Sequence, residues 1–106
     1  MTTTPPEMAL ALARIWAKFQ PEMEQRVALM DEAAQALAIG NLSEEQRESA
    51  YGAAHKLAGS LGLFGMTRGT EIARAMEHLL ESQPVEGEAL AEGVRELRTM
   101  IAAHTA

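Results

Sequence analysis

Apolar residues recur along most of the chain at intervals of three and four positions, which is the period of an amphipathic helix. Proline, glycine and capping residues divide this pattern into successive segments. The predicted helices cover residues 5–19, 21–39, 43–64, 67–82 and 86–104. No segment shows the strict alternation of a half-buried strand. The pattern therefore predicts an all-α protein.

Two of these helices begin with a capping box, in which a hydroxyl and a side chain three residues later satisfy free backbone N–H groups. Thr4 and Glu7 form the first box, and Ser43 and Gln46 form the second. Pro21 interrupts the chain between them and either begins a new helix or bends a continuous one. We expect a new helix from Pro21.

The first predicted helix carries an apolar stripe that we expect to be its buried face. The stripe contains Met8, Leu12, Ile15, Trp16 and Phe19. Helices joined by short connections pack most simply as an antiparallel bundle. We therefore predict that residues 1–106 form one domain, an up-down-up-down four-helix bundle. The additional short N-terminal helix would lie across one end of the bundle or extend the second helix.

Composition narrows the possible functions of this bundle. The 106 residues carry a net charge of −6, which argues against nucleic acid as a partner. There is no cysteine, hence no disulfide and no thiolate chemistry. The sequence contains no run of about 18 apolar residues, the length that spans a membrane. The N-terminus lacks the basic and apolar regions of a secretory signal. We expect a cytoplasmic monomer that neither crosses nor binds a membrane.

Few enzyme classes fit the sequence. The Glu-x-x-His pairs of di-metal bundles are absent, and so are paired histidines, a phosphate-binding loop and a Gly-x-Ser-x-Gly turn. A Ser-His-Asp triad has no fixed spacing, but nothing favours one, and Asp31 is the only aspartate. We therefore expect no metal and no cofactor in this chain, and no self-contained enzyme.

His55 stands out because glycine surrounds it on one face of the predicted helix 43–64. At about 100° per residue, Gly52, Gly59 and Gly62 fall within about 60° of the His55 direction. A glycine inside a helix costs roughly 0.5–1 kcal/mol relative to alanine. Three glycines on this face would leave room for another molecule to approach the imidazole ring. The alternative is that Gly62 and Gly65 end the helix, which leaves Gly52 and Gly59 unexplained.

An exposed imidazole in such a clearing is a competent nucleophile, because it is partly neutral near pH 7 and needs no helper base. The alternative for a lone histidine in a helical protein is a surface or structural residue. We assign that role to His78, at the solvent edge of its helix, and to His104, near the C-terminus.

The segment His55-Lys56-Leu57-Ala58-Gly59-Ser60, followed by Phe64-Gly65, resembles the signature of histidine-containing phosphotransfer (HPt) domains. In that family an apolar residue lies two positions after the histidine, a glycine four, a small residue five and a glycine ten positions after it. Leu57, Gly59, Ser60 and Gly65 match this pattern. The resemblance covers residues 43–81 well, and the remainder of the chain through its helical character.

The resemblance implies one step of a two-component phosphorelay. His55 would accept a phosphoryl group from the phospho-aspartate of a response-regulator receiver domain and pass it to another receiver. The receiver would supply Mg²⁺, and a hybrid histidine kinase is a second candidate partner. The chain would thus be a phosphoryl carrier without an ATP site. The residues implied in phosphate access or environment are Gly59, Lys56, Gly52, Gly62 and Ser60.

Ala58 departs from the family pattern, which has a lysine at this position that is thought to hold the phosphoryl group. Lys56 points about 100° away from His55, although its long stem is flexible. Arg47 lies more than two turns away on the same helix. Arg68 and Arg74, on the following helix, are further candidates for the missing cation.

A rival hypothesis follows from the same departure. The chain would be a non-catalytic helical interaction module that binds a receiver or another helical protein without being phosphorylated. Tyr51 and Met66 either border the partner's footprint or pack within the domain, and the residues alone do not separate these two roles.

Overall fold

The structure is a computed structural model and describes residues 6–104. These residues form four helices, α1 (Pro6–Ala38), α2 (Glu44–Leu63), α3 (Thr67–Glu81) and α4 (Gly87–Ala103), and contain no strand. The prediction of an all-α fold is confirmed. The proposed cap at Thr4 and the predicted helix start at residue 5 lie outside the described residues.

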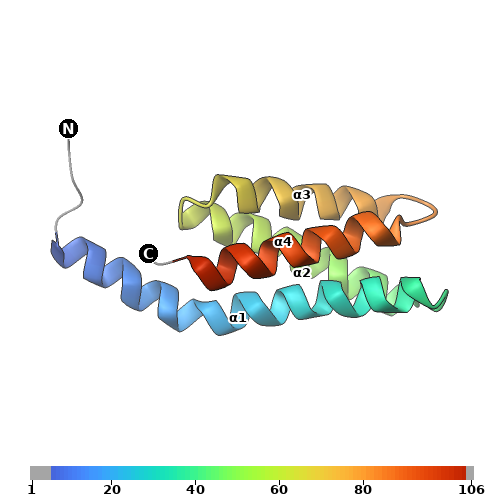
Figure 1. Cartoon of the computed structure of the whole chain (residues 1–106), viewed down its shortest axis with the longest axis horizontal. Helices are drawn as coiled ribbons and strands as arrows, with labels where there is room; N and C mark the ends of the chain where they lie inside the picture. The colour runs from blue at the N-terminus through green and yellow to red at the C-terminus, as the bar shows by residue number, and fades with distance from the viewer. Residues whose placement is uncertain (1–5, 105–106) are drawn as a thin grey trace.

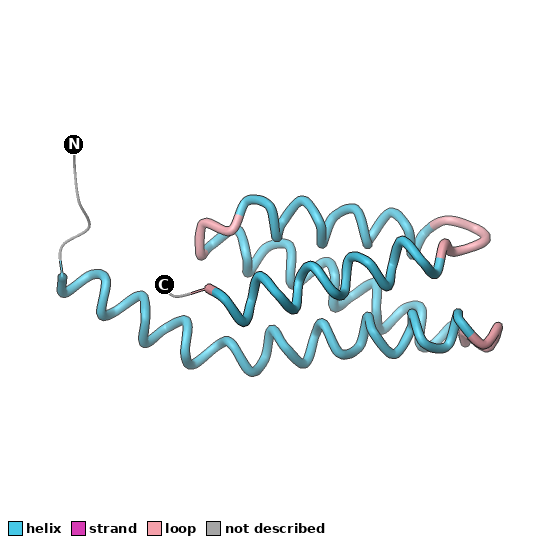
Figure 2. Tube along the Cα trace, viewed as in Figure 1, coloured by secondary structure: helices cyan, strands magenta, loops and turns pink. Residues whose placement is uncertain are grey.

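The four helices pack side by side as a bundle, and consecutive helices run in opposite directions (Figure 1). Each helix contacts two neighbours: α1 and α3 both pack against α2 and against α4. Short loops at the ends of the bundle make the connections (Figure 2). The helices α2, α3 and α4 begin and end within one residue of the ranges expected from the sequence.

The prediction of two separate helices over 5–19 and 21–39 is wrong, because α1 is one continuous helix. The chain is helical from Pro6 to Ala38 with Pro21 inside. Proline has no N–H, so the carbonyl of Ala17 loses its helical donor and the helix bends instead of ending. The bend lies between the blue and cyan parts of α1 in Figure 1. There is thus no additional short N-terminal helix among the described residues.

The first half of α1 extends beyond the rest of the bundle (Figure 1). A helix of 33 residues is about 50 Å long, whereas α2 has only 20 residues to pack against it. The apolar stripe predicted to be buried is therefore largely exposed. Met8, Leu12, Ile15 and Phe19 are all exposed, and Trp16 alone among the stripe is buried.

Trp16 anchors this half of α1 to the end of the bundle. Its ring packs edge-on against Phe64, with centroids 5.0 Å apart, and against His104, with centroids 4.4 Å apart. Phe64 follows α2, and His104 follows α4. His104 therefore has a packing role that its place near the C-terminus did not suggest.

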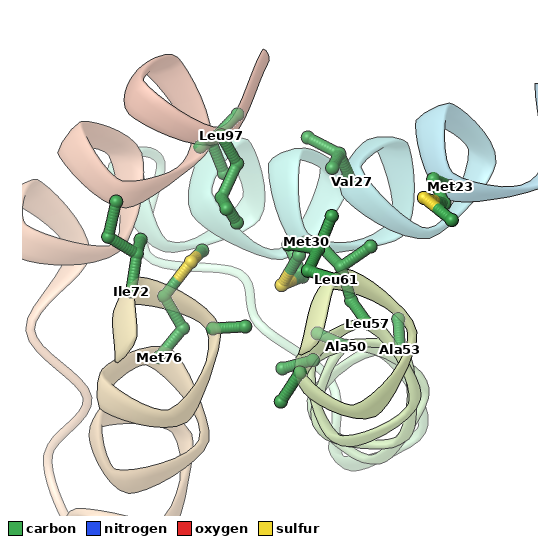
Figure 3. Close-up of a cluster of buried hydrophobic side chains, with 14 of the residues drawn as sticks. Met23, Val27, Met30, Ala50, Ala53, Leu57, Leu61, Ile72, Met76 and Leu97 are labelled. Atoms are coloured by element: carbon green, nitrogen blue, oxygen red, sulfur yellow. The ribbon is translucent and has the colours of Figure 1, made fainter. Parts of the chain in front are cut away.

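The core lies between all four helices and contains aliphatic and methionine side chains (Figure 3). No polar or charged residue among 6–104 is buried. Met66 is part of this core, which decides between its two predicted roles. Helix α2 contributes Ala50, Ala53, Leu57 and Leu61 to the interior, and this choice of inward face determines which of its side chains point outward (Figure 3).

Both ends of α2 are fixed by local hydrogen bonds. At the start, the Gln46 N–H donates to the Ser43 hydroxyl, and the Ser43 N–H donates to the Gln46 side chain, both at 3.0 Å. This is the predicted capping box. At the other end, Gly65 adopts a φ of 73°, and the Met66 N–H donates to the Leu61 carbonyl at 3.0 Å. Glycine adopts this left-handed conformation without a steric penalty.

None of the helices in the described part of the chain is long and apolar enough to cross a membrane.

Candidate functional site

His55 projects from the outer face of α2 into solvent. Its side chain is 71% exposed, while its neighbours Ala54 and Leu57 are fully buried. The buried neighbours pack into the interior of the bundle, so the helix presents the imidazole on the opposite side. The ring is thus accessible to another protein without any rearrangement of the core.

Glu77 of α3 is the contact that orients the imidazole. The distance from His55 Nδ1 to Glu77 Oε2 is 3.3 Å, and the Glu77 side chain is only 16% exposed. A carboxylate only accepts hydrogen bonds, so this contact places the proton of the neutral ring on Nδ1. The lone pair of Nε2 remains free. Spacing along the chain did not indicate Glu77, because the pairing depends on how α2 and α3 are aligned.

The space beside the imidazole is open at two of the three predicted glycines. A Cβ atom built at Gly52 or at Gly59 would meet no atom within 4 Å. Gly62 differs, because a Cβ there would lie 3.4 Å from the Thr70 hydroxyl. Gly62 is itself exposed, but a side chain at this position would contact α3.

Ser60 and Lys56 lie on other parts of the α2 surface. The Ser60 hydroxyl accepts a hydrogen bond from Arg26 Nη1 at 2.9 Å and donates one to the Lys56 carbonyl at 3.0 Å. The Ser60 hydroxyl therefore faces α1. The Lys56 side chain is exposed.

Arg47 is held away from the imidazole by its own partners. Its guanidinium donates to both carboxylate oxygens of Glu44, and Nη1 donates to the Leu80 carbonyl at 3.1 Å. The hydrogen bond from Arg47 lowers the pKa of Glu44, and the same bond raises the pKa of Arg47. This arginine joins the start of α2 to the end of α3 and is occupied in that role.

The two arginines of α3 differ in their surroundings. Arg68 lies 3.6 Å from Glu71 and 3.6 Å from Glu96, so it faces α4. Arg74 is exposed on α3, one turn before Glu77, and no ion pair or hydrogen bond involves it among residues 6–104. Of the two arginines of α3, Arg74 is therefore the one that lies one helical turn from Glu77, the residue that contacts His55.

The seam between α2 and α3 near His55 is acidic. A hydrogen bond between the Tyr51 hydroxyl and the Glu81 carboxylate raises the pKa of Tyr51, and the charges of Glu81 and Glu77 raise it further. Tyr51 is half-buried, and its raised pKa keeps the hydroxyl neutral. A phosphoryl group on His55 would be close to these carboxylates, whose charge repels it.

The site has no cluster of metal ligands. Across residues 6–104 no three histidine, aspartate or glutamate side chains are close enough together to hold a metal ion. The chemistry that the described residues offer is that of one exposed imidazole with a carboxylate behind it.

An apolar groove opens between the first half of α1 and the end of α2. Its volume is about 360 Å³. The groove lies where α1 bends at Pro21. We call it the α1–α2 groove, and its lining residues are Leu12, Ile15, Phe19, Glu22, Met23, Arg26, Ser60, Leu63 and Phe64.

The fold and this face define a known class of protein. The family model of the Hpt domain matches residues 14–106, nearly the whole chain, and the protein belongs to this family. One curated relative is Protein RcaC of Microchaete diplosiphon, which is 33% identical over 69 residues. That alignment covers 65% of this chain but only 11% of RcaC, so the chain spans about a tenth of the relative's length. No solved structure matches the chain.

Proposed function

We propose that this Hpt domain accepts a phosphoryl group on Nε2 of His55 from the phospho-aspartate of a receiver domain and passes it to a second receiver. The observation that carries the proposal is the exposed imidazole whose Nδ1 is held by Glu77 at 3.3 Å. A neutral ring with its proton on Nδ1 has a nucleophilic lone pair on Nε2, the nitrogen that faces solvent.

The transfer step needs only positioning and charge balance from this chain. The Nε2 lone pair attacks phosphorus, an N–P bond forms, and the P–O bond to the receiver's aspartate breaks. The aspartate leaves as a carboxylate with the bonding electron pair. The ring keeps its Nδ1 proton and becomes cationic, and the Glu77 carboxylate offsets that charge. Mg²⁺ belongs to the receiver in this proposal.

Docking in this proposal uses the surface around His55. The open space at Gly52 and Gly59 lets the receiver's backbone approach the ring closely, which brings the reacting atoms within attacking distance. The α1–α2 groove offers apolar area on the neighbouring part of the surface. Both partners would be cytoplasmic receivers, and they would use the same face in turn.

The decisive experiment follows the transfer of labelled phosphate from a panel of phosphorylated receivers. The wild-type protein should take up acid-labile, base-stable label, whereas His55→Gln should take up none and keep its helix content. His78→Gln is the matched control, because His78 is an exposed histidine on the next helix, and it should label normally. Label on His55→Gln would refute the assignment.

A non-catalytic interaction module is the second candidate, because Ala58 stands where the family has a lysine. This candidate predicts that a receiver binds the wild-type protein but leaves no label on His55. Binding and labelling measured on the same receiver therefore distinguish the two functions.

A further inference from the structure

Position 58 supplies no cation in this protein, because the residue there is alanine. Ala58 is 4% exposed, and its carbonyl accepts a hydrogen bond from the Thr70 hydroxyl at 2.8 Å. The carboxylates of Glu77, beside His55, and of Glu81, beside Tyr51, give the seam a negative charge. A dianionic phosphoryl group next to them needs a positive charge from elsewhere.

The alignment of α2 with α3 shows which residue lies level with position 58. The helices run antiparallel, and two observations fix their register: His55 contacts Glu77, and a Cβ atom built at Gly62 would lie 3.4 Å from the Thr70 hydroxyl. Each pair is seven residues from the other along its own helix, which corresponds to about 10.5 Å on both. The two contacts therefore agree on one register.

Arg74 occupies the level of Ala58 in this register. Moving three residues along α2 from His55 to Ala58 advances about 4.5 Å, and moving three residues back along α3 from Glu77 to Arg74 advances the same distance in the same direction. Around α3, Arg74 points about 60° from Glu77. The core residues of α3 are on the other side, so Arg74 lies on the solvent side of the seam, as His55 does.

We propose that Arg74 contacts the phosphoryl group on His55 and supplies, from α3, the positive charge that the family places at position 58. This inference rests on the proposed phosphotransfer function. Arg47 is bound to Glu44 and Leu80, and Arg26 is bound to Ser60 and Glu22. A guanidinium is permanently charged, matches the geometry of phosphate oxygens and has a long flexible stem.

The test uses two phosphoryl donors, a phosphorylated receiver and phosphoramidate, a small donor that needs no docking. With both donors, Arg74→Gln should take up label roughly 10- to 100-fold more slowly than wild type, and its phosphohistidine should hydrolyse at a changed rate. Arg74→Lys should keep most of the wild-type rate. Arg68→Gln, which alters the other exposed arginine of α3, should match wild type.

A double variant tests directly whether a lysine at position 58 can replace the charge of Arg74. Ala58→Lys in the Arg74→Gln background should recover much of the lost rate with phosphoramidate. Circular dichroism and thermal unfolding of each variant verify that the bundle is folded.

The outcomes separate the two hypotheses. Wild-type rates and phosphohistidine lifetime in a folded Arg74→Gln protein would overturn the role of Arg74 and leave the proposed function intact. A loss with the receiver but not with phosphoramidate would assign Arg74 to docking and would also overturn the inference. Failure of the wild-type protein to take up label from any receiver would overturn the proposed function, and this inference with it.

Discussion

The tautomer of His55 depends on a single carboxylate from another helix. Glu77 is mostly buried and makes its contact with Nδ1, so the exposed nitrogen is Nε2. A hydrogen bond of this kind selects which ring nitrogen carries the proton. The exposed face of the imidazole is therefore set by residues on two helices.

Replacement of Glu77 by alanine should release the ring. We expect receiver-to-His55 transfer to slow by roughly tenfold, since the nucleophile is no longer held in one tautomer and orientation. ¹⁵N NMR of the imidazole should show mainly the Nδ1–H form in wild type and a mixture in Glu77→Ala. Glu71→Ala, at an exposed glutamate of the same helix, is the control. An unchanged tautomer in Glu77→Ala would contradict this role.

Gly59→Leu should block docking without unfolding the helix. The position is open to solvent, so leucine meets no clash within the protein but projects into the space that the receiver needs. Transfer from a phosphorylated receiver should fall by roughly 100-fold or more, whereas labelling by phosphoramidate and the thermal midpoint should change little. Normal transfer from the receiver would show that the open face is incidental.

Residue by residue, helical geometry predicted the site only in part. The positions of His55, Gly52 and Gly59 follow from the angle of each residue about one helix axis, which the sequence contains. The contacts of Glu77 and Gly62 depend on the sliding and rotation of α3 against α2. Spacing along the chain does not encode that register, and the structure was needed to find both.

Among the helices, α1 differs most from the prediction, because its continuity through Pro21 depends on the packing of both of its halves. Its second half is held by the core, and its first half is held by Trp16 between Phe64 and His104. The proline therefore bends a helix that is anchored on either side. Capping signals predicted the start of α2 and Gly65 its end, because those contacts are local. Whether Pro21 ends the helix or only bends it depends on contacts with residues that are distant in the sequence.

Trp16→Ala should detach the first half of α1. The ring is 4% exposed, and loss of a large buried aromatic side chain costs about 3–5 kcal/mol. We expect a lower free energy of unfolding in urea and faster amide exchange in residues 6–20. Ile15→Ala, at the exposed neighbouring position, should cost less than about 1 kcal/mol. Equal losses in the two variants would contradict the anchoring role of Trp16.

The contribution of the Glu44–Arg47 pair at the start of α2 to stability should depend on pH. The folded protein lowers the pKa of Glu44 below its usual value of 4.5. The contribution of Glu44 to stability is therefore present above that pH and is lost as the pH falls through the folded pKa. Arg47→Gln should lower the thermal midpoint at pH 7. We expect the difference from wild type to narrow at pH 3, whereas a constant difference would leave only the Leu80 contact.

At the scale of the whole molecule, an apolar groove lies between the first half of α1 and the end of α2. Ile15→Ser and Phe19→Ser remove apolar area from this groove and should weaken receiver binding by roughly tenfold. Met8→Ser, at an exposed position outside the groove, is the control. Calorimetric titration with a receiver measures all three. Equal affinities throughout would exclude the groove from the interface.

The single exposed imidazole of His55 also limits the order of events in the proposed phosphorelay. In the proposed function, one exposed imidazole would receive one partner at a time, so donor and acceptor receivers would compete for the same surface. The domain would then release the donor receiver before the acceptor receiver binds, and it would carry the phosphoryl group alone in between. A surplus of either idle receiver would therefore slow the flow of signal, which makes the relative abundance of the partners a control on the pathway.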